Sequence, residues 1–170
     1  NDAMPVQNQS RTGTCWSFSA LSFFESELMR MGKGKINLSE MFIVRNAYVD
    51  KAEKYVRMHG KINFAQGGAF HDIPWVIKRY GIVPESEYNG LRYGLNYHNH
   101  GEMEAVLKGM VDAVIENKNK KLTPVWKSAV AAVVDTYLGE VPEEFEVEGK
   151  TYTPQSYAEH LNLDMENYVS

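Results

Sequence analysis

Residues 9–20 read Gln-Ser-Arg-Thr-Gly-Thr-Cys-Trp-Ser-Phe-Ser-Ala, and this stretch decides both the fold and the chemistry that the sequence predicts. Cys15 is the one cysteine in 170 residues. Apolar side chains follow it at helical spacing, at positions 18, 21, 24, 28 and 31. The pattern predicts a half-buried helix that is capped by Thr14 and ends at Gly32. A cysteine in the first turn of a helix has its thiolate stabilised by the free backbone N–H groups there.

A lone cysteine is more often a small buried apolar residue than a nucleophile. The residues around Cys15 therefore have to indicate which of the two roles applies. Gln9 lies six residues before Cys15 on an irregular segment. From there its side-chain N–H can point to the place where an acyl oxyanion would form beside the Cys15 backbone N–H. Gly13 carries no side chain and lets the two parts approach. One short segment could therefore supply both a nucleophile and an oxyanion hole.

The rest of the chain predicts a mainly helical protein with one small β-hairpin. Further helices are expected at about 39–58, 70–80, 103–115, 123–138 and 153–161, and the hairpin at 145–152. The segment 101–139 should form an antiparallel helical pair that exposes part of an apolar stripe. The residues of this stripe are Met103, Met110, Trp126, Val133 and Val134.

Composition excludes several classes of partner. The chain is 44% apolar and 24% charged, which is ordinary for a globular domain. A net charge of -4 argues against a nucleic-acid partner and against a polybasic membrane contact. The longest uncharged stretch, 12–24, is too short and too polar to span a bilayer. One cysteine leaves no internal disulfide.

Four motifs, in order along the chain, resemble those of papain-like cysteine peptidases. They are Gln9 with Cys15-Trp16-x-Phe18-Ser19-Ala20, then Leu38-Ser39-Glu40, then Gly67-Gly68, then Tyr80-Gly81-Ile82 with Tyr88. The resemblance implies an α+β papain-like fold, present here mainly as the helical lobe plus an inserted helical hairpin. It also implies that Cys15 is the nucleophile, that Gln9 binds the oxyanion and that Gly67 and Gly68 pair with a peptide substrate. Neither a metal nor a cofactor is implied.

Two positions narrow the resemblance to one branch. Secreted papain relatives carry a cysteine pair where this sequence has Thr12 and Ala65. The sequence resembles the bleomycin hydrolase and aminopeptidase C branch in three features. These are the absence of that cysteine pair, the helical stretch after residue 90 and the run Val83-Pro84-Glu85-Ser86. Members are thiol aminopeptidases and often homo-hexamers, so a homo-oligomer is implied. They are cytosolic or bacterial, which implies a cytoplasmic location and leaves an exported bacterial form open.

The histidine that such an enzyme needs is not evident. His160 lies at the distance from Cys15 at which papain sequences carry theirs, but its surroundings predict a capped helix. The Asn-Ser-Trp-Gly run that accompanies the family's catalytic residues does not occur. We therefore expect residues 1–90 to be the helical lobe with the nucleophile and 91–170 to be a mostly helical insertion. A β-rich lobe with His and Asn is expected beyond Ser170, as the C-terminal half of the same protein, and residues 1–170 alone are expected to be inactive.

Two alternatives stay open. His98 and His100, with Glu102 or His71, offer two imidazoles and a carboxylate for zinc, although their spacing is not an established ligand pattern. No cysteine pair supports such a site, so we expect these residues to form a polar loop that leads into the helix at Met103. In function, the alternative to a peptidase is a catalytically incompetent papain-like interaction or assembly module. The mass of the natural polypeptide separates these two functions, because only the enzyme needs a much longer chain.

Overall fold

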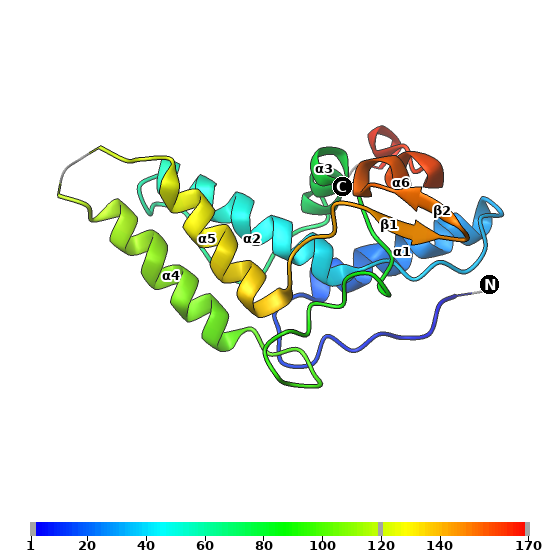
Figure 1. Cartoon of the computed structure of the whole chain (residues 1–170), viewed down its shortest axis with the longest axis horizontal. Coiled ribbons are helices and arrows are strands. Elements are labelled where there is room, and N and C mark those ends of the chain that lie inside the picture. Colours follow the sequence, from blue (N-terminus) through cyan, green and yellow to red (C-terminus); the bar gives the residue numbers. More distant parts are fainter. Residues whose placement is uncertain (1–2, 119–120, 169–170) are drawn as a thin grey trace.

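A computed structural model describes residues 3–118 and 121–168 of the protein. Within these residues the chain forms six α-helices, one antiparallel pair of strands and one short 3₁₀ helix (Figure 1). In chain order they are α1 (Cys15–Arg30), α2 (Glu40–Arg57), α3 (Asp72–Tyr80), α4 (Gly101–Ile115), α5 (Val125–Leu138), β1 (Phe145–Val147), β2 (Lys150–Tyr152), α6 (Pro154–Leu161) and η1 (Met165–Asn167). The predicted helices and hairpin are confirmed. Three starts are shifted: α3 begins at Asp72, α4 begins at Gly101, and α5 has Pro124 rather than Thr123 as its N-cap.

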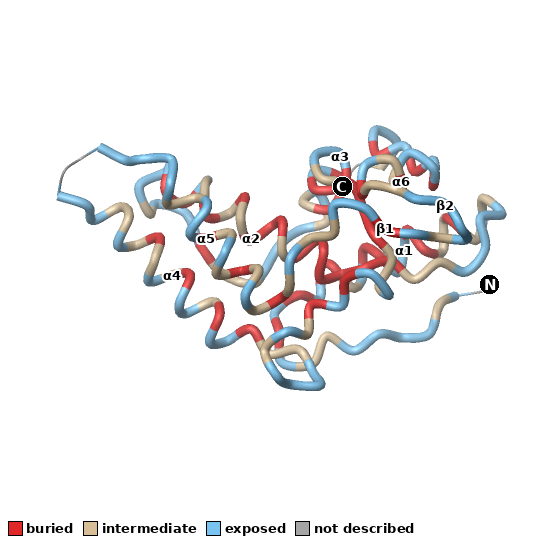
Figure 2. The backbone as a smooth tube through the Cα atoms, in the orientation of Figure 1, coloured by how far each residue is buried: buried red, intermediate tan, exposed pale blue. Residues whose placement is uncertain are grey.

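Helix α2 is the centre of the molecule. It packs against α1, α3, α4 and α5, and most of its residues are buried (Figure 2). A helix that is covered all round must bury its polar side chains as well, and Glu40, Asn46 and Asp50 are indeed buried. Ser39 caps the helix as its sequence position predicts, because its Oγ accepts a 3.0 Å hydrogen bond from the Phe42 N–H.

Helix α1 positions the N-terminal segment on this core. Leu21, Phe24 and Leu28 are fully buried, as their periodicity predicts. The Ser17 hydroxyl, also fully buried, donates a 3.1 Å hydrogen bond to the Glu40 carbonyl oxygen and so joins the first turns of α1 and α2. The start of α1 is thus held firmly to the centre of the fold.

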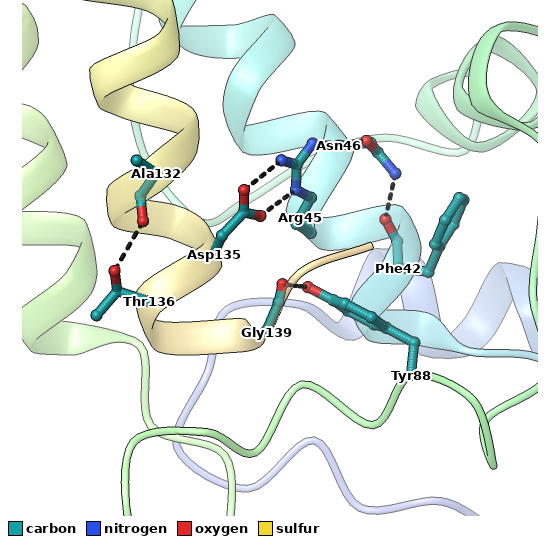
Figure 3. Close-up of polar contacts among 8 residues, drawn as sticks. All are labelled: Phe42, Arg45, Asn46, Tyr88, Ala132, Asp135, Thr136 and Gly139. Carbon is teal, nitrogen blue, oxygen red and sulfur yellow. Dashed lines mark hydrogen bonds and ion pairs between the residues drawn. The ribbon is translucent and has the colours of Figure 1, made fainter. Parts of the chain in front are cut away.

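The predicted antiparallel pair is α4 with α5, and it lies along α2 (Figure 1). Two contacts hold the end of α5 in place (Figure 3). Arg45 on α2 makes a double ion pair with Asp135, with Nε–Oδ1 and Nη2–Oδ2 distances of 2.8 and 2.9 Å. The Tyr88 hydroxyl donates a 2.9 Å hydrogen bond to the Gly139 carbonyl oxygen.

The expected exposed stripe on this pair is partly wrong. Met103 and Val134 are buried, while Met110, Trp126 and Val133 are half-buried. The reason is that α4 and α5 pack on α2 as well as on each other, which covers a second apolar face. In the connection between them, residues 119–120 lie outside the described residues. No helix in the described ranges has both the length and the apolar character needed to cross a membrane.

The last elements close the other end of the core. Strands β1 and β2 are joined by Glu148 and Gly149, both with positive φ, which is the backbone that a two-residue hairpin turn requires. Helix α6 begins with a capping box between Thr153 and Ser156 and packs against α3. His160 is exposed near the end of α6.

Candidate functional site

The sequence-predicted nucleophile, Cys15, is an exposed free thiol on the first residue of α1. Thr14 occupies the predicted cap position, but its hydroxyl bonds the Thr12 hydroxyl at 2.5 Å instead of capping the helix. Among the described residues, no acceptor binds the backbone N–H of Cys15 or of Trp16. Free N–H groups at a helix start attract negative charge, so they can stabilise both a thiolate and an oxyanion at this point.

The segment before Cys15 is folded into a tight turn that holds Gln9. The Gln9 Nε2 donates to the Thr12 carbonyl oxygen at 2.8 Å, and the Thr12 hydroxyl donates back to the Gln9 carbonyl oxygen at 2.9 Å. Ser10 between them has a φ of +54°. A glutamine amide has two N–H donors, and the Thr12 contact uses one. The turn keeps Gln9 on the segment that leads into Cys15, and its role toward an oxyanion stays a prediction.

Gly67 and Gly68, to which the resemblance gives a substrate-pairing role, lie in an exposed loop beside the start of α1. Gly68 packs against the Trp16 indole, and the Trp16 Nε1–H donates to the Gln66 carbonyl oxygen at 2.9 Å. The structure thus brings the glycine motif next to the cysteine motif. In the described part of the chain, nothing hydrogen-bonds the backbone N–H or C=O of Gly68. An extended peptide could pair with these groups in the manner of an added strand.

Sequence reasoning missed two side chains that hold this loop, Lys51 and Gln66. The Lys51 ammonium bonds the carbonyl oxygens of Gly67 and, at 3.4 Å, Ala65, and lies 5.0 Å from the centre of the Trp16 ring. Burial lowers the pKa of Lys51. Neither residue belongs to a local motif, because each acts across a long sequence separation, so the sequence carried no signal for them.

The histidines of the zinc alternative are structural neighbours of the nucleophile segment. The Arg11 N–H donates to the His98 carbonyl oxygen at 2.9 Å, and the His100 N–H donates to the Arg11 carbonyl oxygen at 3.4 Å. His100 is fully buried, and burial, followed by the proximity of His98, lowers its pKa to about 4. Exposed His71 lies apart at the start of α3. Among residues 3–118 and 121–168, no three His, Cys, Asp or Glu side chains are grouped to hold a metal.

His160, which we expected to be a surface helix residue, is exposed and rests against the Tyr152 ring, with ring centres 5.1 Å apart. All five histidines of the chain lie among the described residues, and none of them is hydrogen-bonded to Cys15 there. The described residues therefore provide an exposed thiol at a helix start, without a hydrogen bond from a histidine to that thiol.

Several known proteins are similar to this chain in sequence. The model of the family described as "Papain family cysteine protease" matches residues 1–158. Aminopeptidase G of Lactobacillus delbrueckii subsp. lactis is 24% identical over 204 residues, covering 96% of this chain and 46% of that protein. Bleomycin hydrolase of Gallus gallus is 26% identical over 214 residues, covering 99% of this chain and 46% of that protein.

A solved structure, PepW of Lactobacillus rhamnosis, superposes with a TM-score of 0.64 at 19% sequence identity. The superposition covers 94% of this chain and 44% of that one. Together with the family match, it confirms the expected α+β papain-like fold. The chain spans just under half the length of these relatives.

Proposed function

We propose that this chain, which belongs to the papain family of cysteine proteases, carries the nucleophile of a cysteine-type aminopeptidase. The observation that carries the proposal is the exposed Cys15 thiol on the first residue of α1, beside the exposed and unpaired backbone of Gly68. The names of the relatives, aminopeptidases C, G and W, support removal of N-terminal residues rather than cleavage within a chain.

In this proposal the Cys15 thiolate attacks the carbonyl carbon of the scissile peptide bond. The carbonyl oxygen takes the negative charge and is stabilised by the Cys15 backbone N–H and the Gln9 amide. When the C–N bond breaks, the leaving amine takes a proton from a general acid and a thioester remains on Cys15. Water then attacks the thioester, which releases the acid and restores the thiol. Gly67 and Gly68 hold the substrate extended by backbone pairing.

The general acid, a histidine, and the asparagine that orients it are proposed to come from sequence outside residues 1–170, in a β-rich C-terminal half of the same protein. Residues 1–90 would then supply the nucleophile lobe, and 91–170 a helical insertion that packs on it. Assembly into a homo-oligomer, a hexamer by analogy with the family branch, belongs to the same proposal.

The test uses the natural polypeptide and pairs of peptides that differ only in a free or acetylated N-terminus. We expect release of the N-terminal residue from the free peptide alone. Gln9→Ala should lower kcat by about 10²–10³, the usual effect of one lost oxyanion donor. The matched control is Gln7→Ala, because Gln7 is exposed on the same segment. Equal cleavage of both peptides would identify an endopeptidase, and no cleavage of either would favour the interaction module.

A further inference from the structure

Gln66 makes two hydrogen bonds between the nucleophile segment (residues 9–16) and the glycine loop (residues 62–68). Gln66 directly precedes Gly67 in a loop without helix or strand. In the described ranges, no backbone-to-backbone hydrogen bond joins residues 62–68 to residues 9–16. The relative position of Cys15 and Gly68 must therefore come from side chains and from packing.

Gln66 reaches both sides of Cys15. Its Oε1 accepts a 2.7 Å hydrogen bond from the Gly13 N–H, two residues before the nucleophile. Its backbone oxygen accepts the Trp16 indole N–H at 2.9 Å, one residue after the nucleophile. The approach is close, because a Cβ added to Gly13 would lie 3.1 Å from the Gln66 Cβ. Gln66 is thus hydrogen-bonded to Gly13 and to Trp16, on the two sides of Cys15.

A carboxylate holds the other end of the Gln66 amide. The Gln66 Nε2 donates a 2.6 Å hydrogen bond to Glu104 Oε2, in the first turn of α4. A backbone N–H can bond only the amide oxygen, and a carboxylate can bond only the amide NH₂, so the two partners together allow one orientation of the side chain. The negative charge on the donor side also polarises the amide and strengthens its oxygen as an acceptor.

We propose that Gln66 and Glu104 form a clamp that positions Cys15 relative to the substrate-pairing backbone of Gly68. Both are positioning residues, because they act through Gly13, Trp16 and the glycine loop rather than on the substrate. The proposal deepens the peptidase assignment and rests on it for its kinetic consequences. It also gives the α4–α5 pair a role, since Glu104 lies on α4 and would connect that pair to the active-site segment.

The amide of Gln66 and the carboxylate of Glu104 can be exchanged by mutation to test this contact. Gln66→Glu keeps an acceptor for the Gly13 N–H but places a second carboxylate against Glu104. Glu104→Gln alone keeps a hydrogen bond between two amides. In the double variant Gln66→Glu/Glu104→Gln, the amide at position 104 donates to the carboxylate at position 66. The matched control is Gln155→Glu, because Gln155 is exposed on α6 and its side chain makes no hydrogen bond among the described residues. All four variants are made in the natural polypeptide and their Tm values are measured.

We expect Gln66→Glu to lower kcat/KM about 100-fold, because a shift of about 1 Å at a reacting group has that effect, with a raised KM as part of the loss. Alkylation of Cys15 by iodoacetamide should slow about tenfold, and the double variant should recover both rates. Glu104→Gln should lower kcat/KM less than Gln66→Glu, because its amide oxygen still accepts the Gln66 NH₂ without the carboxylate charge. Gln155→Glu should stay close to the unchanged protein. An unchanged kcat/KM in Gln66→Glu, or a loss that Glu104→Gln does not restore, would overturn the clamp.

The two readouts separate this proposal from the function on which it rests. If the unchanged protein cleaves no peptide, the peptidase assignment fails, and the alkylation rates still test the clamp in the same variants. If the unchanged protein is active but neither rate responds to Gln66→Glu, the clamp alone fails.

Discussion

Gly68 lies so close to Trp16 that an added Cβ would be 2.6 Å from the ring atoms Cδ2 and Cε2. No side chain fits there unless the loop or the indole moves. Trp16 follows the nucleophile directly, so a movement of the indole also moves the helix start. This contact and the two hydrogen bonds of Gln66 together place the glycine loop against the start of α1.

Replacing Gly68 by alanine should therefore damage catalysis more than folding. We expect kcat/KM to fall about 100-fold, since displacement of about 1 Å from the reacting group costs this much. Gly109→Ala is the control, because an added Cβ there has nothing within 4 Å and alanine favours the helix. Steady-state kinetics and Tm of both variants check the expectation. A fully active Gly68→Ala protein would show that the contact does not set the site.

His160 should be dispensable for hydrolysis. It is exposed on α6 and rests on Tyr152, without a hydrogen bond to Cys15. We expect His160→Ala in the natural polypeptide to change kcat by less than about threefold, as surface changes away from a site usually do. If His160→Ala eliminated activity while Tm stayed the same, the catalytic histidine would lie within this chain, and the proposal of a separate C-terminal half would be wrong.

Three carboxyl groups are packed together where α1 and α2 meet the segment after α3. Burial, and then the nearby Glu25, raise the pKa of Glu40 to about 7. Burial and then Glu40 raise the pKa of Glu85 to about 8. Burial also raises the pKa of Glu25, whose Oε1 accepts a 2.9 Å hydrogen bond from the Leu38 N–H. Like charges in a poorly solvated place disfavour ionisation of each other.

These shifts give a pH dependence of known sign. The folded state binds the Glu40 proton more tightly than the unfolded state, in which the pKa is near 4.5. The contribution of Glu40 to the free energy of unfolding is therefore fully present below pH 4.5, and it is lost as the pH rises through 7. Glu40→Gln removes the ionisation, so the variant should gain stability relative to the unchanged protein as the pH increases over this range.

Urea unfolding of both proteins at several pH values measures this difference. The two proteins have to be compared at each pH, because the titration of His100 changes the stability of both in the direction opposite to that of Glu40. Its lowered pKa adds stability as the pH rises from 4 to 6.5, and both proteins share that term. A free-energy difference between the proteins that stays constant, or that falls with pH, would contradict the buried ionisation of Glu40.

The parts of the site that lie within one segment were predictable from the sequence. The apolar spacing after Cys15 and the Gly32 stop located α1, and the Leu38-Ser39-Glu40 motif located the start of α2. These features are local, because helix periodicity and capping depend on residues a few positions apart. The sequence also singled out Gly67 and Gly68, whose role toward substrate stays a prediction, but it did not indicate the packing of Gly68 against Trp16.

The rest depends on contacts between residues far apart in the sequence. Gln66 contacts Gly13 across 53 positions and Glu104 across 38, and no local pattern reports such a pairing. The sequence did not indicate which polar residues are buried either. His100, for example, follows a polar loop and yet is fully buried. The burial of the stripe on α4 and α5 was not predictable either, because its second face is covered by α2, which ends 44 positions before α4 begins.

The most direct test of the account is the rate at which the natural polypeptide releases the N-terminal residue of a peptide, before and after Cys15→Ser. The exchange replaces one sulfur atom on an exposed helix start, so folding and Tm should not change. We expect kcat to fall by a factor on the order of 10⁴ or more, the scale of losing a catalytic nucleophile. Retention of the original rate in a folded Cys15→Ser protein would contradict the assignment of Cys15 as the nucleophile.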